Sequence, residues 1–185
     1  MSVLLDIILF FRADRLIQRG LFFYTKMRIR RIEKSSKQII NFVPQGSFDF
    51  DIMGPVSKFK IHPTSHIKSG TFIECSGGVS IGKYFHVGRG LTIFSSNHNW
   101  RSSEFLPYDS ESILAPVVIG DGVWCGANVT ITPGATIGDG VVIAAGSVVV
   151  GNIPAGKVYG GNPAKEIASR DIVLLNKLLS NNKFF

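Results

Sequence analysis

A six-residue spacing of small and aliphatic residues constrains the fold of this chain more than any other feature. The spacing begins at Ile119 and continues through Ile119, Cys125, Ile131, Ile137, Ile143 and Val149. Four positions beyond each of these lie further small or β-branched residues, namely Val123, Val129, Ala135, Val141, Ser147 and Ile153. A period of six fits neither an α-helix at 3.6 residues per turn nor a long strand alternating at two. It predicts short strands separated by sharp turns, which stack as the coils of a solenoid.

Glycine supports this interpretation, because three of the six aliphatic positions are followed directly by Gly120, Gly126 and Gly138. Glycine adopts the backbone conformations that sharp turns require and that other residues resist. Most of the chain's 20 glycines fall between residues 70 and 161. We therefore expect inward side chains to form ladders, with coils separated by the usual strand spacing of about 4.8 Å.

The same spacing extends upstream and contains one long interruption. It runs through Ile61, Ile67, Ile73 and Val79, and a slip of two residues at "GGVSIG" resets it to Ile81, Val87 and Ile93. The spacing then fails between Asn99 and Pro116 and restarts at Val117 and Ile119. We expect an all-β solenoid over residues 41–168 with a loop extruded at 99–116.

Composition and charge narrow the class of protein. Hydrophobic residues make up 45% of the 185 residues and charged residues 18%, which indicates a packed globular protein. The net charge of +7 is concentrated in residues 1–40, which hold nine Lys or Arg against three acidic residues. The remaining residues are nearly neutral, and no helix-turn-helix, zinc-finger or RNA-binding signature is present. We therefore expect no nucleic-acid partner.

Residues 1–40 are predicted to form a basic amphipathic helical segment. The apolar run "VLLDIILFF" contains Asp6 and is too short to span a bilayer, and no small-residue cleavage site follows it. Two interpretations stay open. The segment packs on the body or on a neighbouring subunit, or residues 1–31 lie on an anionic membrane surface with four phenylalanines in the interface. These are Phe10, Phe11, Phe22 and Phe23.

The two cysteines and the C-terminal segment carry no predicted chemistry. Cys75 and Cys125 belong to no pairing motif, which favours a reducing compartment and a cytoplasmic location. Cys125 occupies an aliphatic position of the repeat and is expected to be buried. In residues 169–185, Ile172, Leu175 and Leu179 have helical spacing, so we predict a helix that caps the last coil.

The segment "IGDGVWCGANVTITPGATIGDGVVIAAGSVVVGNIPAGKVYGGNPAKEI", from Ile119 to Ile167, resembles the hexapeptide-repeat acyltransferases. With "NHNW" and "LPYD" ahead of it, the chain is similar to the branch that O-acetylates sugars and bacterial surface polysaccharides. The resemblance covers roughly Ile61 to Arg170. It implies a left-handed parallel β-helix of triangular section, with three hexapeptides per coil, assembled as a homotrimer. The handedness comes from the resemblance alone, since general rules for parallel crossovers favour the right hand.

The resemblance also implies an activity, the transfer of an acetyl group from acetyl-CoA to a hydroxyl of a sugar or of a capsule, exopolysaccharide or lipopolysaccharide unit. His98, at the root of the extruded loop, matches the catalytic histidine of these enzymes. Imidazole titrates close to neutral pH and can remove the hydroxyl proton as the oxygen attacks. The thioester is already activated, so we expect a ternary complex without an acyl-enzyme, in which His98 then protonates the departing thiolate. Backbone N–H groups of nearby coil turns would stabilise the oxyanion.

Further site residues follow from the same resemblance. The expected acceptor contacts are Asn97, Trp100, Tyr108 and Asp109, and the imidazole could be oriented by Glu104, Asp109 or Glu111. Acetyl-CoA is expected to contact Trp124, Gly126, Ala127, Ala145, Gly146, Ser147, Lys165 and Arg170. One departure is that the family continues after "GSVV" with a Thr-Lys-Asp-like run, whereas this chain reads Val150, Gly151, Asn152. The missing lysine removes a cationic contact to the cofactor.

Three alternatives remain beside this hypothesis. An enzyme of the same fold could act on an amino sugar, an antibiotic or serine, or the β-helix could be a non-catalytic scaffold that docks through its basic N-terminus. Some left-handed β-helix trimers instead hold zinc through three histidines, and this chain offers His62, His66, His86 and His98. Their spacing does not match that family, so we expect no metal.

Overall fold

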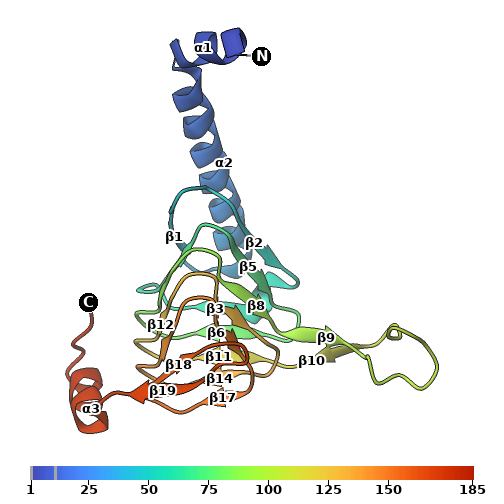
Figure 1. Ribbon diagram of the computed structural model, residues 1–185, viewed down its shortest axis with the longest axis vertical. Helices are drawn as coiled ribbons and strands as arrows, with labels where there is room; N and C mark the ends of the chain where they lie inside the picture. The colour runs from blue at the N-terminus through green and yellow to red at the C-terminus, as the bar shows by residue number, and fades with distance from the viewer. Residues whose placement is uncertain (1, 11) are drawn as a thin grey trace.

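The computed structural model describes residues 2–10 and 12–185. Its body is a stack of triangular coils, with a long helix leaving one end and a hairpin leaving one side (Figure 1). Three five-stranded sheets form the sides of the triangle. The first sheet contains β2 (Phe50–Met53), β5 (Thr71–Glu74), β8 (Thr92–Phe94), β13 (Thr130–Ile131) and β16 (Val148–Val149). The second contains β3 (Phe59–Ile61), β6 (Val79–Ile81), β11 (Val117–Ile119), β14 (Thr136–Ile137) and β17 (Asn152–Ile153).

The third sheet contains β7 (His86–Val87), β12 (Trp124–Cys125), β15 (Val142–Ile143), β18 (Lys157–Gly160) and β19 (Lys165–Ser169). All its strands pair in parallel except β19, which is antiparallel to β18. Before it in the stack, β1 (Asn41–Val43) pairs in parallel with β4 (His66–Lys68). A short 3₁₀ helix, η1 (Val56–Lys58), precedes β3.

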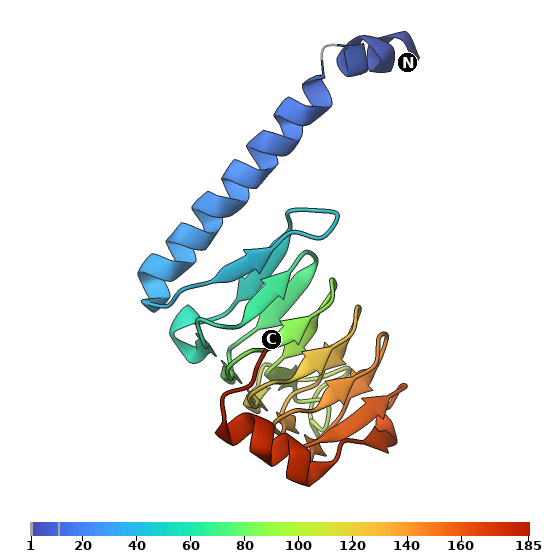
Figure 2. The ribbon, with the colours of Figure 1, turned by 90° about the vertical axis from the view of Figure 1, so that its left-hand side faces the viewer.

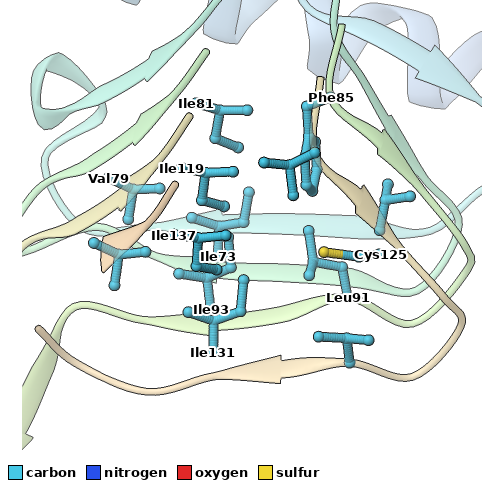
Figure 3. Packing of buried hydrophobic residues seen from close by; sticks show 14 of the residues in the cluster. Ile73, Val79, Ile81, Phe85, Leu91, Ile93, Ile119, Cys125, Ile131 and Ile137 are labelled. Atoms are coloured by element: carbon cyan, nitrogen blue, oxygen red, sulfur yellow. The ribbon is translucent and has the colours of Figure 1, made fainter. Parts of the chain in front are cut away.

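The strand register confirms the coil that the six-residue spacing predicts. Ile119 pairs with Ile137, Cys125 with Ile143, and Ile131 with Val149, so one coil contains eighteen residues and three six-residue steps. All six side chains are at most 2% exposed. Figure 3 shows the resulting ladders, in which side chains from successive coils lie above one another. Two labelled ladders are Ile81, Ile119 and Ile137, and Ile73, Ile93 and Ile131.

Coil length varies at both ends of the stack. Ile61 pairs with Ile81, twenty residues later, because the two extra residues predicted at "GGVSIG" are accommodated in the turn before β6. At the other end, Ile153 pairs with Ile137 after sixteen residues. The step of six therefore ends at Val149, and the chain turns early at Gly151, whose φ of 76° suits glycine.

The N-terminal helices touch the solenoid over only part of their length. They are α1 (Ser2–Phe10) and α2 (Ala13–Ser36). Thr25 is the buried residue of α2, and its Oγ1 donates a hydrogen bond to the carbonyl of Phe48 at 2.6 Å. Ile29 and Ile32 pack against the core. The N-terminal half of α2 and all of α1 extend away from the solenoid (Figure 2).

The C-terminal helix α3 (Ile172–Ser180) runs along one side of the solenoid, rather than over its last coil as we expected. Leu175 lies against Gly140 and Gly156, and Leu179 lies near Gly122. These glycines form the corner turns between the second and third sheets in three successive coils. Because β19 turns back along β18, it returns the chain to this corner, where turns without a Cβ leave room for leucine side chains.

Candidate active site

The interruption of the repeat folds as an antiparallel hairpin. Its strands are β9 (Ser96–His98) and β10 (Ser112–Leu114), with Asn97 opposite Ile113 and His98 opposite Ser112. The chain thus leaves the coil a few residues before the predicted boundary at residue 99. The hairpin follows β8 and precedes β11, so it projects from the corner between the first and second sheets (Figure 1).

The Glu74 carboxylate holds the start of this hairpin in place through hydrogen bonds, a role that the sequence did not predict. Its carboxylate accepts hydrogen bonds from the Ser76 N–H at 2.6 Å, the Ser95 N–H at 3.2 Å and the Ser96 hydroxyl at 2.8 Å. Burial alone would raise the pKa of Glu74, but these hydrogen bonds outweigh it and lower the pKa below 4.5. The isolation of Glu74 in the sequence could have indicated a specific role, because no other acidic residue occurs between residues 52 and 103.

Glu74→Gln is expected to lower the free energy of unfolding by about 1 kcal/mol at pH 7, because an amide NH2 would face hydrogen-bond donors. A carboxylate with a lowered folded pKa stabilises the protein above the unfolded value and loses this contribution as pH falls through the folded value. The difference between wild type and variant should therefore shrink below pH 4.5. Urea unfolding at pH 7 and pH 4 measures it, with the loop variant Glu104→Gln as control. Equal midpoints for Glu74→Gln and wild type at pH 7 would contradict this role.

The His98 imidazole is exposed and stacks flat on Tyr108. The ring centroids are 3.8 Å apart and the planes differ by 10°. Offset aromatic stacking contributes about 0.5–1.5 kcal/mol, which restricts the orientation of the imidazole. Neither ring nitrogen forms a hydrogen bond with the described residues. The hairpin therefore presents a positioned imidazole whose nitrogens are free for other groups.

The remaining predicted acceptor residues share this hairpin. Asp109 accepts hydrogen bonds from the Asn99 side-chain amide at 2.7 Å and from the Glu111 N–H at 2.9 Å. The Glu111 N–H is the main cause of a pKa for Asp109 below its usual range. Asn97 is exposed and its Oδ1 accepts the His98 N–H, while Trp100 is exposed with Arg101 over its ring. Within the described residues, Glu104, Asp109 and Glu111 form no hydrogen bond or ion pair with the imidazole, which stacks on Tyr108.

Half of the predicted cofactor residues line a groove on the third sheet. The groove has a volume of about 690 Å³ and lies between the sheet, α3 and the chain end. Trp124 projects from β12 into it and is 54% exposed. The predicted cofactor residues in its lining are Trp124, Gly126, Ala127 and Arg170.

The predicted cofactor turns stack at the corner between the third and first sheets. A Cβ on Gly126 would lie 2.5 Å from the amide nitrogen of Ala145, so glycine is required for the two coils to approach. Gly146 donates its N–H to the Ala127 carbonyl at 2.8 Å. Among the described residues, the N–H groups of Ala127 and Ala145 have no hydrogen-bond acceptor. This corner therefore exposes a short column of turns with two available donors.

Ser147, Lys165 and Arg170 complete the predicted cofactor set. Ser147 occupies an inward position of the repeat, where its hydroxyl donates to the Ala144 carbonyl and accepts from the Gly161 N–H. Its side chain is therefore unavailable to a ligand. Lys165 begins β19 and Arg170 directly follows its end, so their Cα atoms are about 16 Å apart for five strand steps. Arg170 Nε also donates to the Gly140 carbonyl at 2.8 Å.

Within one copy of the chain, the hairpin and the groove lie on different sides of the solenoid. The hairpin leaves the corner between the first and second sheets, whereas Trp124 lies on the third sheet. In Figure 1 the hairpin and β12 lie on opposite sides of the body. One copy therefore does not bring His98 to its own predicted cofactor residues.

The other histidines do not join His98. The rings of His66 and His86 meet edge to face at 4.8 Å beside Trp124, while His62 Nδ1 lies 2.9 Å from the Thr64 hydroxyl. Burial, and then the neighbouring His86 and Lys68, lower the pKa of His66 to about 4. No group of three or more His, Cys, Asp or Glu side chains in residues 2–10 and 12–185 is arranged to hold a metal ion.

The lowered pKa of His66 predicts acid sensitivity. Unfolding returns the pKa to about 6.5, so the unfolded state binds the proton first and the protein loses stability as pH falls from 6.5 towards 4. His66→Gln removes this proton linkage. Urea unfolding of both proteins at several pH values should show a shallower loss of stability for the variant over this range. Parallel curves for wild type and variant would show that His66 titrates normally.

Known proteins share both the repeat and the fold. Residues 116–151 match the family model described as bacterial transferase hexapeptide (six repeats). The putative lipopolysaccharide biosynthesis O-acetyltransferase WbbJ of Escherichia coli is 42% identical over 96 residues, which cover 48% of this chain and 49% of that protein. The chain spans about half or less of the length of the curated relatives that it matches first.

Solved structures match over nearly the whole chain. A hexapeptide-repeat-containing acetyltransferase from Vibrio cholerae, in complex with acetyl coenzyme A, is 25% identical with a TM-score of 0.64 and covers 86% of this chain and 91% of its own. A maltose O-acetyltransferase from Clostridium difficile is 26% identical with a TM-score of 0.60, and the match covers 84% of this chain and 89% of that chain. The chain therefore contains the bacterial transferase hexapeptide repeat over residues 116–151 and has the fold of these acetyltransferases, a left-handed parallel β-helix.

Proposed function

We propose that this protein transfers an acetyl group from acetyl-CoA to a hydroxyl of a sugar or of a bacterial surface polysaccharide such as capsule, exopolysaccharide or lipopolysaccharide. The observation that carries the proposal is the exposed, stacked His98 on a hairpin that interrupts the hexapeptide repeat. Similar proteins are named as O-acetyltransferases of lipopolysaccharide biosynthesis and of maltose, and one is described with acetyl coenzyme A.

In the proposed reaction, His98 acts as general base in a ternary complex. One free imidazole nitrogen takes the proton of the acceptor hydroxyl as the oxygen attacks the thioester carbonyl. The C–S bond then breaks, and the imidazolium returns the proton to the departing thiolate. Tyr108 keeps the ring oriented, while Asn97, Trp100 and Asp109 are the surrounding candidates for acceptor contacts.

Acetyl-CoA is proposed to bind along the groove and the adjoining turns. Trp124 would cover the pantetheine, and the N–H groups of Ala127 and Ala145 would serve as donors to its amides or to the oxyanion. Lys165 and Arg170 are too far apart to bind one phosphate group, so they would contact different phosphates of the cofactor. The absence of a lysine at Val150–Asn152 leaves fewer cations for this task.

The separation of hairpin and groove supports a homotrimer. The His98 hairpin of one copy would meet the Trp124 groove of the next, and each site would then contain residues of two copies. The reaction would take place in the cytoplasm, where acetyl-CoA is formed. Both cysteines are buried and unpaired, as a reducing compartment favours.

The test is an acceptor panel incubated with acetyl-CoA, read by thiol release and by the mass of the product. The panel contains sugars, surface oligosaccharides, an amino sugar, an antibiotic and serine. We expect an alkali-labile ester on a sugar hydroxyl. An alkali-stable amide on the amino sugar or on serine would favour the alternative acceptors. Absence of both thiol release and coenzyme A binding would favour the scaffold and defeat the enzymatic proposal.

A further inference from the structure

The N-terminal arm, defined as residues 2–10 and 12–27, exposes an unusually apolar surface. Many of its large apolar side chains are between 49% and 80% exposed. They are Val3, Leu4, Leu5, Ile7, Leu9, Phe10, Leu16, Ile17, Leu21, Phe23, Tyr24 and Met27. The solenoid leaves this surface uncovered because the arm extends beyond it (Figure 2).

The arm is amphipathic along α2. Leu16, Gly20, Phe23 and Met27 follow one another at three- or four-residue steps, and Ile17, Leu21 and Tyr24 do the same beside them. Residues at these steps share one face of a helix. A second stripe carries Arg15, Arg19 and Lys26, which are related by four and seven residues, and Arg30 continues it beyond the arm, where it pairs with Glu33. The helix therefore has a broad apolar face bordered by a row of cations.

Contacts with the body identify which side chains belong to this face. Phe22, which one of the two open interpretations assigned to a membrane interface, packs on Phe48 with ring centroids 5.5 Å apart. Arg28 pairs with Asp51 at 2.6 Å. Both residues are therefore turned towards the solenoid and excluded from the face. Phe11 lies outside the described residues.

The charge of the arm distinguishes between two possible partners, further copies of the chain and a lipid surface. The arm holds Arg12, Arg15, Arg19 and Lys26 against Asp6 and Asp14, so packing the arms of several copies together would bring an excess of cations close to one another. An anionic lipid surface offers apolar chains to one face and negative headgroups to the adjacent cations. No helix within the described ranges is long and apolar enough to cross a membrane. We propose that the apolar face and basic stripe of the N-terminal arm dock this protein on the surface of an anionic lipid bilayer.

Vesicle flotation of the full chain tests this proposal independently of acetyl transfer. Vesicles of phosphatidylcholine with phosphatidylglycerol are compared with vesicles of phosphatidylcholine alone. We expect binding to the anionic vesicles that weakens at high salt. Arg15→Glu/Arg19→Glu, and separately Leu16→Ser/Phe23→Ser, should each lower the partition coefficient about tenfold or more. The matched control Lys60→Glu/Lys83→Glu changes the charge equally on exposed positions of the solenoid and should bind like wild type.

Three results would overturn the proposal. The first is equal binding by the arm variants and the control pair. The second is equal binding to neutral and anionic vesicles. The third is a smaller assembly for Leu16→Ser/Phe23→Ser than for wild type in vesicle-free buffer, measured by sedimentation velocity. That outcome would show that a second copy of the chain occupies the apolar face.

Discussion

His98→Ala is expected to reduce the rate of acetyl transfer by about a hundred- to ten-thousand-fold, the range that a positioned general base contributes. In the proposed reaction the acceptor hydroxyl loses its proton to the imidazole as it attacks, and among the described residues no second histidine and no carboxylate is hydrogen-bonded to the imidazole to take over this role. Initial rates of thiol release from acetyl-CoA, at saturating acceptor, measure the effect.

Binding of acetyl-CoA separates this role from a structural one. His98 lies on an exposed hairpin, and its ring stacks on Tyr108. Because the proposed role of the imidazole concerns the acceptor hydroxyl, His98→Ala should still bind coenzyme A, and its unfolding free energy should fall by no more than the stack contributes, about 0.5–1.5 kcal/mol. Tyr108→Phe, which preserves the stacked ring, should retain most activity, whereas Tyr108→Ala should lose part of it. Equal turnover by His98→Ala and wild type would remove His98 from the mechanism.

Ile131→Ala should have the largest effect on stability, about 2–5 kcal/mol of unfolding free energy. The side chain is fully buried, and its strand pairs with Ile93 of one coil and Val149 of the next. A cavity at this rung removes contacts on both sides, because each coil of a solenoid is stabilised by its neighbours.

The matched control is Thr136, which lies on the second sheet with its side chain pointing away from the core. Thr136 is exposed on β14, so Thr136→Ala should change the unfolding free energy by about 0.5 kcal/mol or less. Urea unfolding at one fixed protein concentration, followed by circular dichroism, compares the two variants. Similar losses for Ile131→Ala and Thr136→Ala would mean that the six-residue ladder does not form the core.

The solenoid was predictable because the six-residue spacing marks its inward positions. The number of three steps per coil came from the family resemblance, and the Ile119–Ile137 register confirms it. The interruption near Asn99 indicated an extruded loop, because extra residues cannot fit into an eighteen-residue coil, and the structure shows that this loop begins and ends as the antiparallel pair of β9 and β10. The handedness also came from the family resemblance, since periodicity is the same for either hand.

Other parts of the site depend on contacts that periodicity does not encode. The spacing itself gives the inward position of Ser147, but it does not give the partners of the hydroxyl, the Ala144 carbonyl and the Gly161 N–H. Arg170 and Lys165 are close in sequence, but an extended strand separates them. Glu74 acts through hydrogen bonds to the next coil, and the path of α3 depends on the reversal at β19. Such long-range contacts are set by the folded chain.

The most direct measurement is transfer of a carbon-13-labelled acetyl group from acetyl-CoA to a surface oligosaccharide, followed by carbon NMR for wild type and His98→Ala. The proposed function predicts an ester carbonyl signal on the sugar with wild type, released by mild alkali, and almost none with the variant at equal protein concentration. An equal ester signal from both proteins, or label that never leaves the thioester although coenzyme A binds, would contradict it.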